Sequence, residues 1–89
     1  MDNIADRYKK SIIPIIDDIF DIVTWGEFAK SYFPDHSVSW FYNKMRGVDG
    51  NGGVGAFTEK ELTHFAGSLI DLSERIRAAA IRINPPRQS

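Results

Sequence analysis

The sequence contains no cysteine among its 89 residues. A disulfide scaffold, a zinc site made of thiolates and a thiol nucleophile are therefore excluded. His36 and His64 are far apart in the sequence and neither lies in a metal-binding motif, so we expect no metal and no cofactor. Serine, histidine and aspartate occur without a nucleophile elbow, so we expect the protein not to be an enzyme.

Long hydrophobic runs are also missing. The longest, Ile12 to Ile16, contains Pro14 and stops at Asp17, far short of the roughly 20 residues that a membrane-spanning helix needs. The N-terminal segment carries acids where a signal peptide has a basic start, and no apolar core follows it. We therefore expect a soluble, cytoplasmic protein that has no membrane partner.

The chain has no large excess of positive or negative charge, since its formal net charge is −1. Domains that bind phosphate are usually basic overall, so this value argues mildly against a nucleic-acid partner. The charges are unevenly distributed, however, because acids gather in the N-terminal third and the residues from Arg75 onward include arginines but no acid. A neutral protein can still carry a local basic face. Asp17, Asp18 and Asp21 are expected to form a solvated face rather than a carboxylate site.

The length and the 43% hydrophobic content support one domain with one modest core. Apolar residues recur at spacings of three and four, which predicts an all-α fold of four to five helices. A chain this small is marginally stable alone, so a second copy is a candidate partner. The expected divisions are a single helical domain over 1–89, with a helix-turn-helix at 24–47, a glycine-rich loop at 47–57, a C-terminal helix at 58–83 and a tail at 84–89.

A first helix is expected from about Asn3 to Ile22, because isoleucines recur there with helical spacing. Pro14 lies inside this segment. Proline removes a backbone donor and clashes with the preceding turn, so the helix either kinks there or divides into two pieces, the second opening at Pro14. The sequence leaves both alternatives open.

The helix-turn-helix is predicted from capping signals. Thr24 and Glu27 form a capping-box pattern, so a helix should start at Trp25 and end near Phe33, ahead of Pro34.

The second helix of this unit has its own start and stop signals. Asp35 or Ser37 can cap it, and it should run to Arg46 and stop at Gly47, a residue suited to a left-handed C-cap. The glycine-rich segment 47–55 fits neither an EF-hand nor a phosphate-binding loop. Asn51-Gly52 could close a short hairpin if Val48 and Val54 pair across it, but a mobile connector is the leading expectation.

A second capping box, Thr58 to Glu61, announces the C-terminal helix, which should end before Pro85. At 1.5 Å per residue this helix is roughly 35 to 40 Å long, more than so small a domain can cover. Its end should project, pack on a partner or fray. The expected apolar stripe consists of Leu62, Phe65, Ala66, Leu69, Leu72 or Ser73, Ile76, Ala80 and Ile83.

The string WGEFAKSYF, a turn, SWFYNKMRG and then FTEKELTHFAGSLIDLSERI resembles the helix-turn-helix of phage repressors. It resembles more closely a family of small gut-bacterial proteins associated with mobile elements, which carries a domain of unknown function. The similarity covers about Val23 to Ile76. It implies a transcriptional regulator or accessory factor of a mobile element that binds duplex DNA. The chain departs from the repressor pattern because Phe33 is followed by Pro34 where a glycine is usual.

In that interpretation the second helix reads a DNA groove. Asparagine suits adenine, arginine suits guanine or phosphate, and lysine and serine suit phosphate. An alternative is a solvated helix face with Trp40 in the core, since most aromatics between Trp25 and Phe57 are expected to be core residues. The candidate DNA-binding residues are Ser37, Ser39, Trp40, Asn43, Lys44 and Arg46.

Two hypotheses follow. The first is a DNA-binding protein that forms a homodimer through its C-terminal or N-terminal helix. The second is a non-catalytic adaptor for protein–protein contacts that has a helix-turn-helix-like fold and binds no DNA. The acidic N-terminal segment and the near-neutral charge favour the second.

Overall fold

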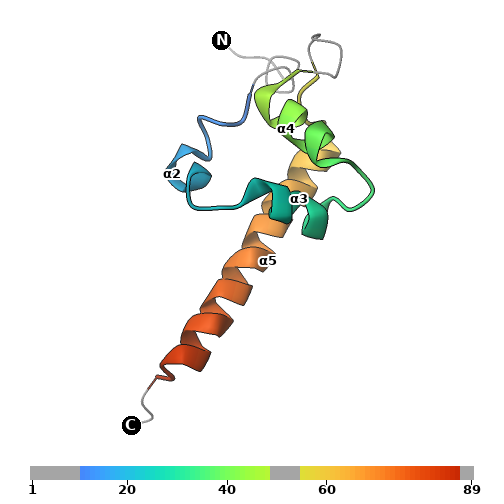
Figure 1. The fold of residues 1–89 in the computed structure, drawn as a ribbon. Coiled ribbons are helices and arrows are strands. Elements are labelled where there is room, and N and C mark those ends of the chain that lie inside the picture. Colours follow the sequence, from blue (N-terminus) through green and yellow to red (C-terminus); the bar gives the residue numbers. More distant parts are fainter. Residues whose placement is uncertain (1–10, 49–54, 87–89) are drawn as a thin grey trace.

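The computed structural model describes residues 11–48 and 55–86, and every regular element in these ranges is a helix (Figure 1). The all-α fold and the long C-terminal helix are thus confirmed. No helix in these ranges is long and apolar enough to cross a membrane. The elements are α2 (Asp17–Phe20), α3 (Trp25–Tyr32), α4 (Val38–Arg46) and α5 (Glu59–Ile83).

The first helix differs from the prediction. Residues 11–16 form turns, and the helix is confined to α2, so neither a kinked helix nor one opening at Pro14 is present over residues 11–22. The part expected before Ser11 lies outside the described residues. The reason is a long-range contact: the amide of Ile12 (3.1 Å) and the hydroxyl of Ser11 (2.8 Å) both donate to the carbonyl of Met45. These bonds tie the segment to the end of α4 instead of to a helical turn.

Helix α3 begins at Trp25 as predicted, but the predicted capping box between Thr24 and Glu27 does not form. The Thr24 side chain makes no capping hydrogen bond, and Glu27 forms an ion pair with Lys30 at 3.2 Å. Burial fixes the start of the helix instead. The Trp25 side chain is buried, and its Nε1 donates to the carbonyl of Phe20 at 2.9 Å.

Helix α4 has the predicted boundaries. Of the two candidate caps, Ser37 is the one used, because its hydroxyl accepts from the amide of Trp40 at 3.0 Å. Gly47 ends the helix with a φ of 79°, the left-handed conformation that favours glycine. The amide of Val48 then donates to the carbonyl of Asn43 at 2.9 Å, which completes a Schellman motif.

Helix α5 opens with the predicted capping box. The amide of Glu61 donates to the Thr58 hydroxyl at 3.2 Å, and the Glu61 carboxylate accepts from the amide of Thr58 at 2.9 Å. The ends of the glycine-rich loop meet through a bond from the amide of Gly55 to the carbonyl of Gly47 at 3.0 Å. The predicted mobility of this loop concerns residues 49–54, which lie outside the described residues.

The core is aromatic, as predicted. Phe41 of α4 is fully buried, and its ring centroid lies 5.2 Å from Phe33, 5.6 Å from Phe57 and 5.3 Å from Phe65. Trp25 joins the same cluster. Because this cluster sits against the beginning of α5, the C-terminal half of that helix projects away from α3 and α4 (Figure 1).

Removing the central ring should destabilise the whole fold. We expect Phe41→Ala to lower the free energy of unfolding by about 3–5 kcal/mol, because it removes contacts with several rings and leaves a cavity. Urea denaturation followed by circular dichroism measures the change. An unfolding midpoint equal to that of the unsubstituted protein would contradict the assigned core.

The two threonine caps give a matched comparison. Thr58→Ala should cost about 1 kcal/mol, because it removes a capping hydrogen bond, whereas Thr24→Ala should change the stability by less than about 0.5 kcal/mol. The same denaturation experiment tests both variants. If both variants lost the same free energy of unfolding, the assignment of a capping hydrogen bond to Thr58 but not to Thr24 would be wrong.

Candidate functional site

The candidate DNA-binding residues lie on or beside α4, but several take part in the fold itself. Ser37 caps the helix, whereas Ser39 is exposed. Trp40 is half-buried. Its ring stacks on His36 with a centroid separation of 3.6 Å and contacts Phe33. Of these polar and aromatic groups, Ser39 is therefore the one most open to a ligand.

The charged candidates are engaged by neighbouring groups. Arg46 Nη2 donates to Asn43 Oδ1 at 2.6 Å. Lys44 Nζ donates to the carbonyl of Ala56 at 3.3 Å and lies 3.8 Å from the Glu61 carboxylate. The Lys44 and Glu61 side chains are 22% and 27% exposed, so the opposite charges offset each other at a partly buried position. All six candidates lie on α4 or directly before it, and the charge of Lys44 is offset by Glu61, whereas Arg46 is exposed and bonds to a neutral amide.

A second surface follows α5. Apolar residues recur along one face of this helix at alternating spacings of three and four, the heptad pattern of coiled coils. Ala79 continues this pattern and is partly buried, whereas Ala80, the residue expected from the sequence, is exposed. The full series is Leu62, Phe65, Leu69, Leu72, Ile76, Ala79 and Ile83.

The two halves of this series have different surroundings. Phe65 is buried, and Leu69 and Leu72 pack against the aromatic core. Beyond Leu72 the stripe continues without cover from α3 or α4, so Ile76 is 60% exposed and Ile83 is 85% exposed. We call Ile76, Ala79 and Ile83 the distal stripe.

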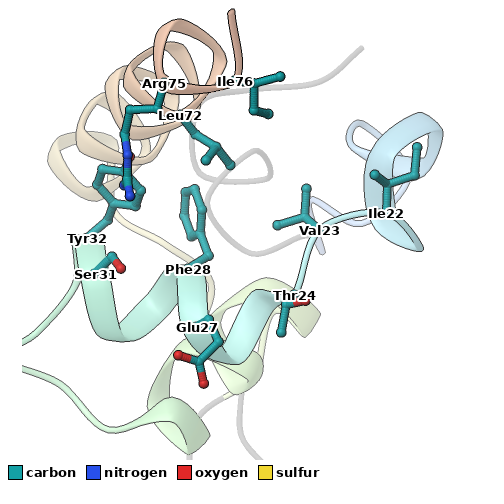
Figure 2. A pocket seen from close by; sticks show the side chains of 10 residues that line it. All are labelled: Ile22, Val23, Thr24, Glu27, Phe28, Ser31, Tyr32, Leu72, Arg75 and Ile76. Carbon is teal, nitrogen blue, oxygen red and sulfur yellow. The ribbon is translucent and has the colours of Figure 1, made fainter. Parts of the chain in front are cut away.

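A groove of about 330 Å³ lies where the distal stripe begins (Figure 2). One wall comes from α5, the floor from α3, and the other wall from the segment that joins α2 to α3. Its apolar lining consists of Ile22, Val23, Phe28, Leu72 and Ile76. Ile22 is 80% exposed, so the groove is continuous with uncovered apolar surface on both sides.

Polar contacts hold one rim of the groove in place. The hydroxyl of Tyr32 donates to Asp71 at 2.6 Å and accepts from Arg75 Nη1 at 3.0 Å. The hydrogen bond that Arg75 donates to Tyr32 and, to a smaller extent, the charge of Asp71 raise the pKa of the Arg75 guanidinium. These contacts connect the last turn of α3 to α5 and keep the Arg75 side chain at the rim.

Sequence reasoning missed this groove, because its residues come from three separate segments. One signal was available: the heptad spacing continues past Leu72, although the helix is too long for the rest of the domain to cover. Within residues 11–48 and 55–86, no three potential metal ligands come together.

The chain was compared with known families, proteins and structures. DUF5053, a family described as a domain of unknown function, matches residues 14–83, a span that includes α2, α3, α4 and α5. No curated protein and no solved structure matches the chain. Because the match covers most of the 89 residues, the chain belongs to the DUF5053 family.

Proposed function

We propose that the protein is a non-catalytic adaptor that binds a helix of a polypeptide along the distal stripe of α5. The observation that carries this proposal is the alignment of exposed apolar side chains next to the groove. Single exposed hydrophobic residues are common on protein surfaces. Here Ile76 and Ile83 share one helix face, and Ile22 adds apolar surface across the groove. Contiguous apolar surface of this kind marks an interaction site.

The spacing of the stripe indicates the geometry of the bound segment. Apolar side chains that alternate at three and four residues pack best against another helix with the same spacing. The charges around the stripe indicate the chemistry of the partner, because Arg75 and Arg82 flank the stripe and residues 75–86 contain no acid. The best partner is an amphipathic helix with acidic residues beside its apolar face.

A substitution at the centre of this surface should weaken binding of such a helix. The probe is a labelled synthetic peptide of three heptads with leucine at the apolar positions and glutamate at the flanking ones. We expect Ile76→Glu to weaken its binding at least about tenfold, since the carboxylate replaces an apolar contact. Fluorescence anisotropy measures the affinity.

Ile70→Glu is the matched control for this experiment. Ile70 lies on the same helix and is 64% exposed, close to the 60% of Ile76, but it lies outside the stripe. This variant should bind the peptide within about twofold of the unsubstituted protein. Equal losses in both variants, or no binding by the unsubstituted protein, would refute the adaptor proposal.

Duplex DNA is the second candidate partner. The specific observation in its favour is the α3–α4 pair, in which Ser39 and Arg46 are exposed on the second helix. In this candidate the protein acts as a regulator or accessory factor of a mobile element, as the resemblance of residues 23–76 implies. The pairing of Lys44 with Glu61 and of Arg46 with Asn43 makes us rank it below the adaptor.

A low-salt binding experiment separates the two candidates. A protein that binds phosphates through α4 has an affinity that falls steeply with salt and depends on Lys44 and Arg46. We expect the adaptor to show no such binding to labelled duplex DNA. Salt-dependent binding that is lost in Lys44→Ala and Arg46→Ala, but kept in the control Lys30→Ala, would favour DNA instead. Circular dichroism should show unchanged helicity in all three variants.

A further inference from the structure

We infer that the helix bound along the distal stripe carries its acidic residues on one edge of its apolar face and neutral or basic residues on the other edge. This inference rests on the proposed function, because it specifies the partner of the same surface. Its basis is the distribution of charge across the groove, where one rim is cationic and the opposite rim is anionic.

The cationic rim follows one edge of the stripe. Arg75 and Arg82 are seven residues apart, so they lie on the same side of α5, each directly before an isoleucine of the distal stripe. In a heptad abcdefg with apolar a and d positions, both arginines occupy g positions, which contact the flank of a bound helix. The e positions on the other edge hold Ser73 and Ala80. The positive charge of α5 therefore borders the stripe on one side only.

The fold holds Arg75 in position on this rim. Its Nη1 donates to the Tyr32 hydroxyl at 3.0 Å, and its guanidinium lies 6.0 Å from the centroid of the Tyr32 ring. The hydroxyl is neutral, and a guanidinium has five N–H donors, so further donors remain for a carboxylate. Asp71 accepts from the same hydroxyl and offsets part of the Arg75 charge, whereas residues 75–86 contain no acid beside Arg82. An acidic side chain on this edge of a bound helix would meet two cations, one of them already oriented.

The opposite rim is anionic. Figure 2 shows Ile22 across the groove from Arg75, on the chain that leaves α2. Residues 11–29 contain no lysine or arginine. A carboxylate on this edge of the bound helix would be repelled, whereas a lysine would be attracted. The exposed acids on this side lie on α2 or directly after it: Asp17, Asp18 and Asp21.

Rims of opposite charge also determine the direction of the bound helix. Reversing a helix on the stripe exchanges the two edges of its apolar face, so only one direction places its acids beside the arginines of α5. In a parallel pair of helices g positions face the e positions of the partner, and in an antiparallel pair they face its g positions. A partner with acids at its e positions should therefore bind parallel to α5, and one with acids at its g positions antiparallel.

Two synthetic peptides of identical composition test the edge preference. Both have three heptads with leucine at a and d. In the segregated peptide every e position is glutamate and every g position is lysine, whereas in the mixed peptide the two residues alternate along each edge. At low ionic strength we expect the segregated peptide to bind at least about threefold more tightly, because all its edge charges meet the opposite sign. Fluorescence anisotropy, with the labelled peptide below its own self-association range, measures both affinities.

The salt dependence and the rim variants identify the charges that discriminate. The advantage of the segregated peptide should shrink at high salt, because exposed charges are screened. It should also shrink in a variant of either rim, but persist in the control Arg77→Gln, since Arg77 is exposed on α5 outside both edges. Equal affinities for the two peptides, or an advantage unchanged in either rim variant, would overturn the inference. The two rim variants are Arg75→Gln/Arg82→Gln and Asp17→Asn/Asp18→Asn/Asp21→Asn.

Energy transfer tests the direction. Because the chain lacks cysteine, Glu74→Cys allows a single label on the face of α5 opposite the stripe. The aromatic core covers the stripe before Leu72, so one end of the bound peptide lies near this label and the other end about 30 Å farther along. A label on the peptide N-terminus should give high transfer when glutamate is at e and low transfer when glutamate and lysine are exchanged. Equal transfer from both peptides would contradict a fixed direction and overturn the inference.

The Ile76→Glu variant separates failure of this inference from failure of the proposed function. If both peptides bind equally and both lose binding in Ile76→Glu, the edge preference is refuted and the adaptor proposal stands. If neither peptide binds, both are refuted. Sedimentation equilibrium of the full chain detects self-association. A dimer that is lost in Ile76→Glu would show that a second copy, which has no acidic edge, occupies the stripe, and this result would overturn the inference.

Discussion

The fold depends on the packing of one ring, that of Phe41. This side chain lies among rings from α3, from the turn that follows it, from the segment before α5 and from α5 itself. Offset and edge-on ring pairs bury much apolar area and add about 0.5–1.5 kcal/mol each beyond that burial. The short helices α3 and α4 have little stability of their own, since isolated helices of this length are marginal in water. Their geometry therefore follows from this cluster.

The position of the cluster determines which surfaces remain for binding. It covers the beginning of α5, so the rest of that helix extends past the domain with an apolar face uncovered. The capping box of α5 also affects α4, because Glu61 both accepts from the amide of Thr58 and lies 3.8 Å from Lys44. Lys44, one of the two cations of α4, is thereby held against an acid. The same arrangement that starts α5 lowers the positive charge available on α4.

The sequence predicted those features that depend on neighbouring residues. Ser37, Gly47 and Thr58 mark helix ends because their bonding partners lie within a few residues. Prediction from neighbouring residues was wrong at Thr24, which makes no capping bond, because burial of Trp25 fixes the start of that helix. It was also wrong for the first helix, which is much shorter than its apolar spacing predicts. There the carbonyl of Met45, distant in sequence, captures the backbone of Ile12. Local patterns contain no information about such a contact.

The candidate site could also be predicted only where it depends on neighbouring residues in the sequence. The length of α5 and its apolar period were visible in the sequence, whereas the groove and the contact of Tyr32 with Arg75 required the positions of three segments. A large apolar face that remains uncovered in a small domain favours association, because any species that binds the folded form also stabilises it. In this protein Ile76 and Ile83 lie outside the aromatic core, so their burial by a partner would add to the apolar area that the folded chain removes from water. Binding along α5 and stability of the domain are therefore expected to be thermodynamically coupled.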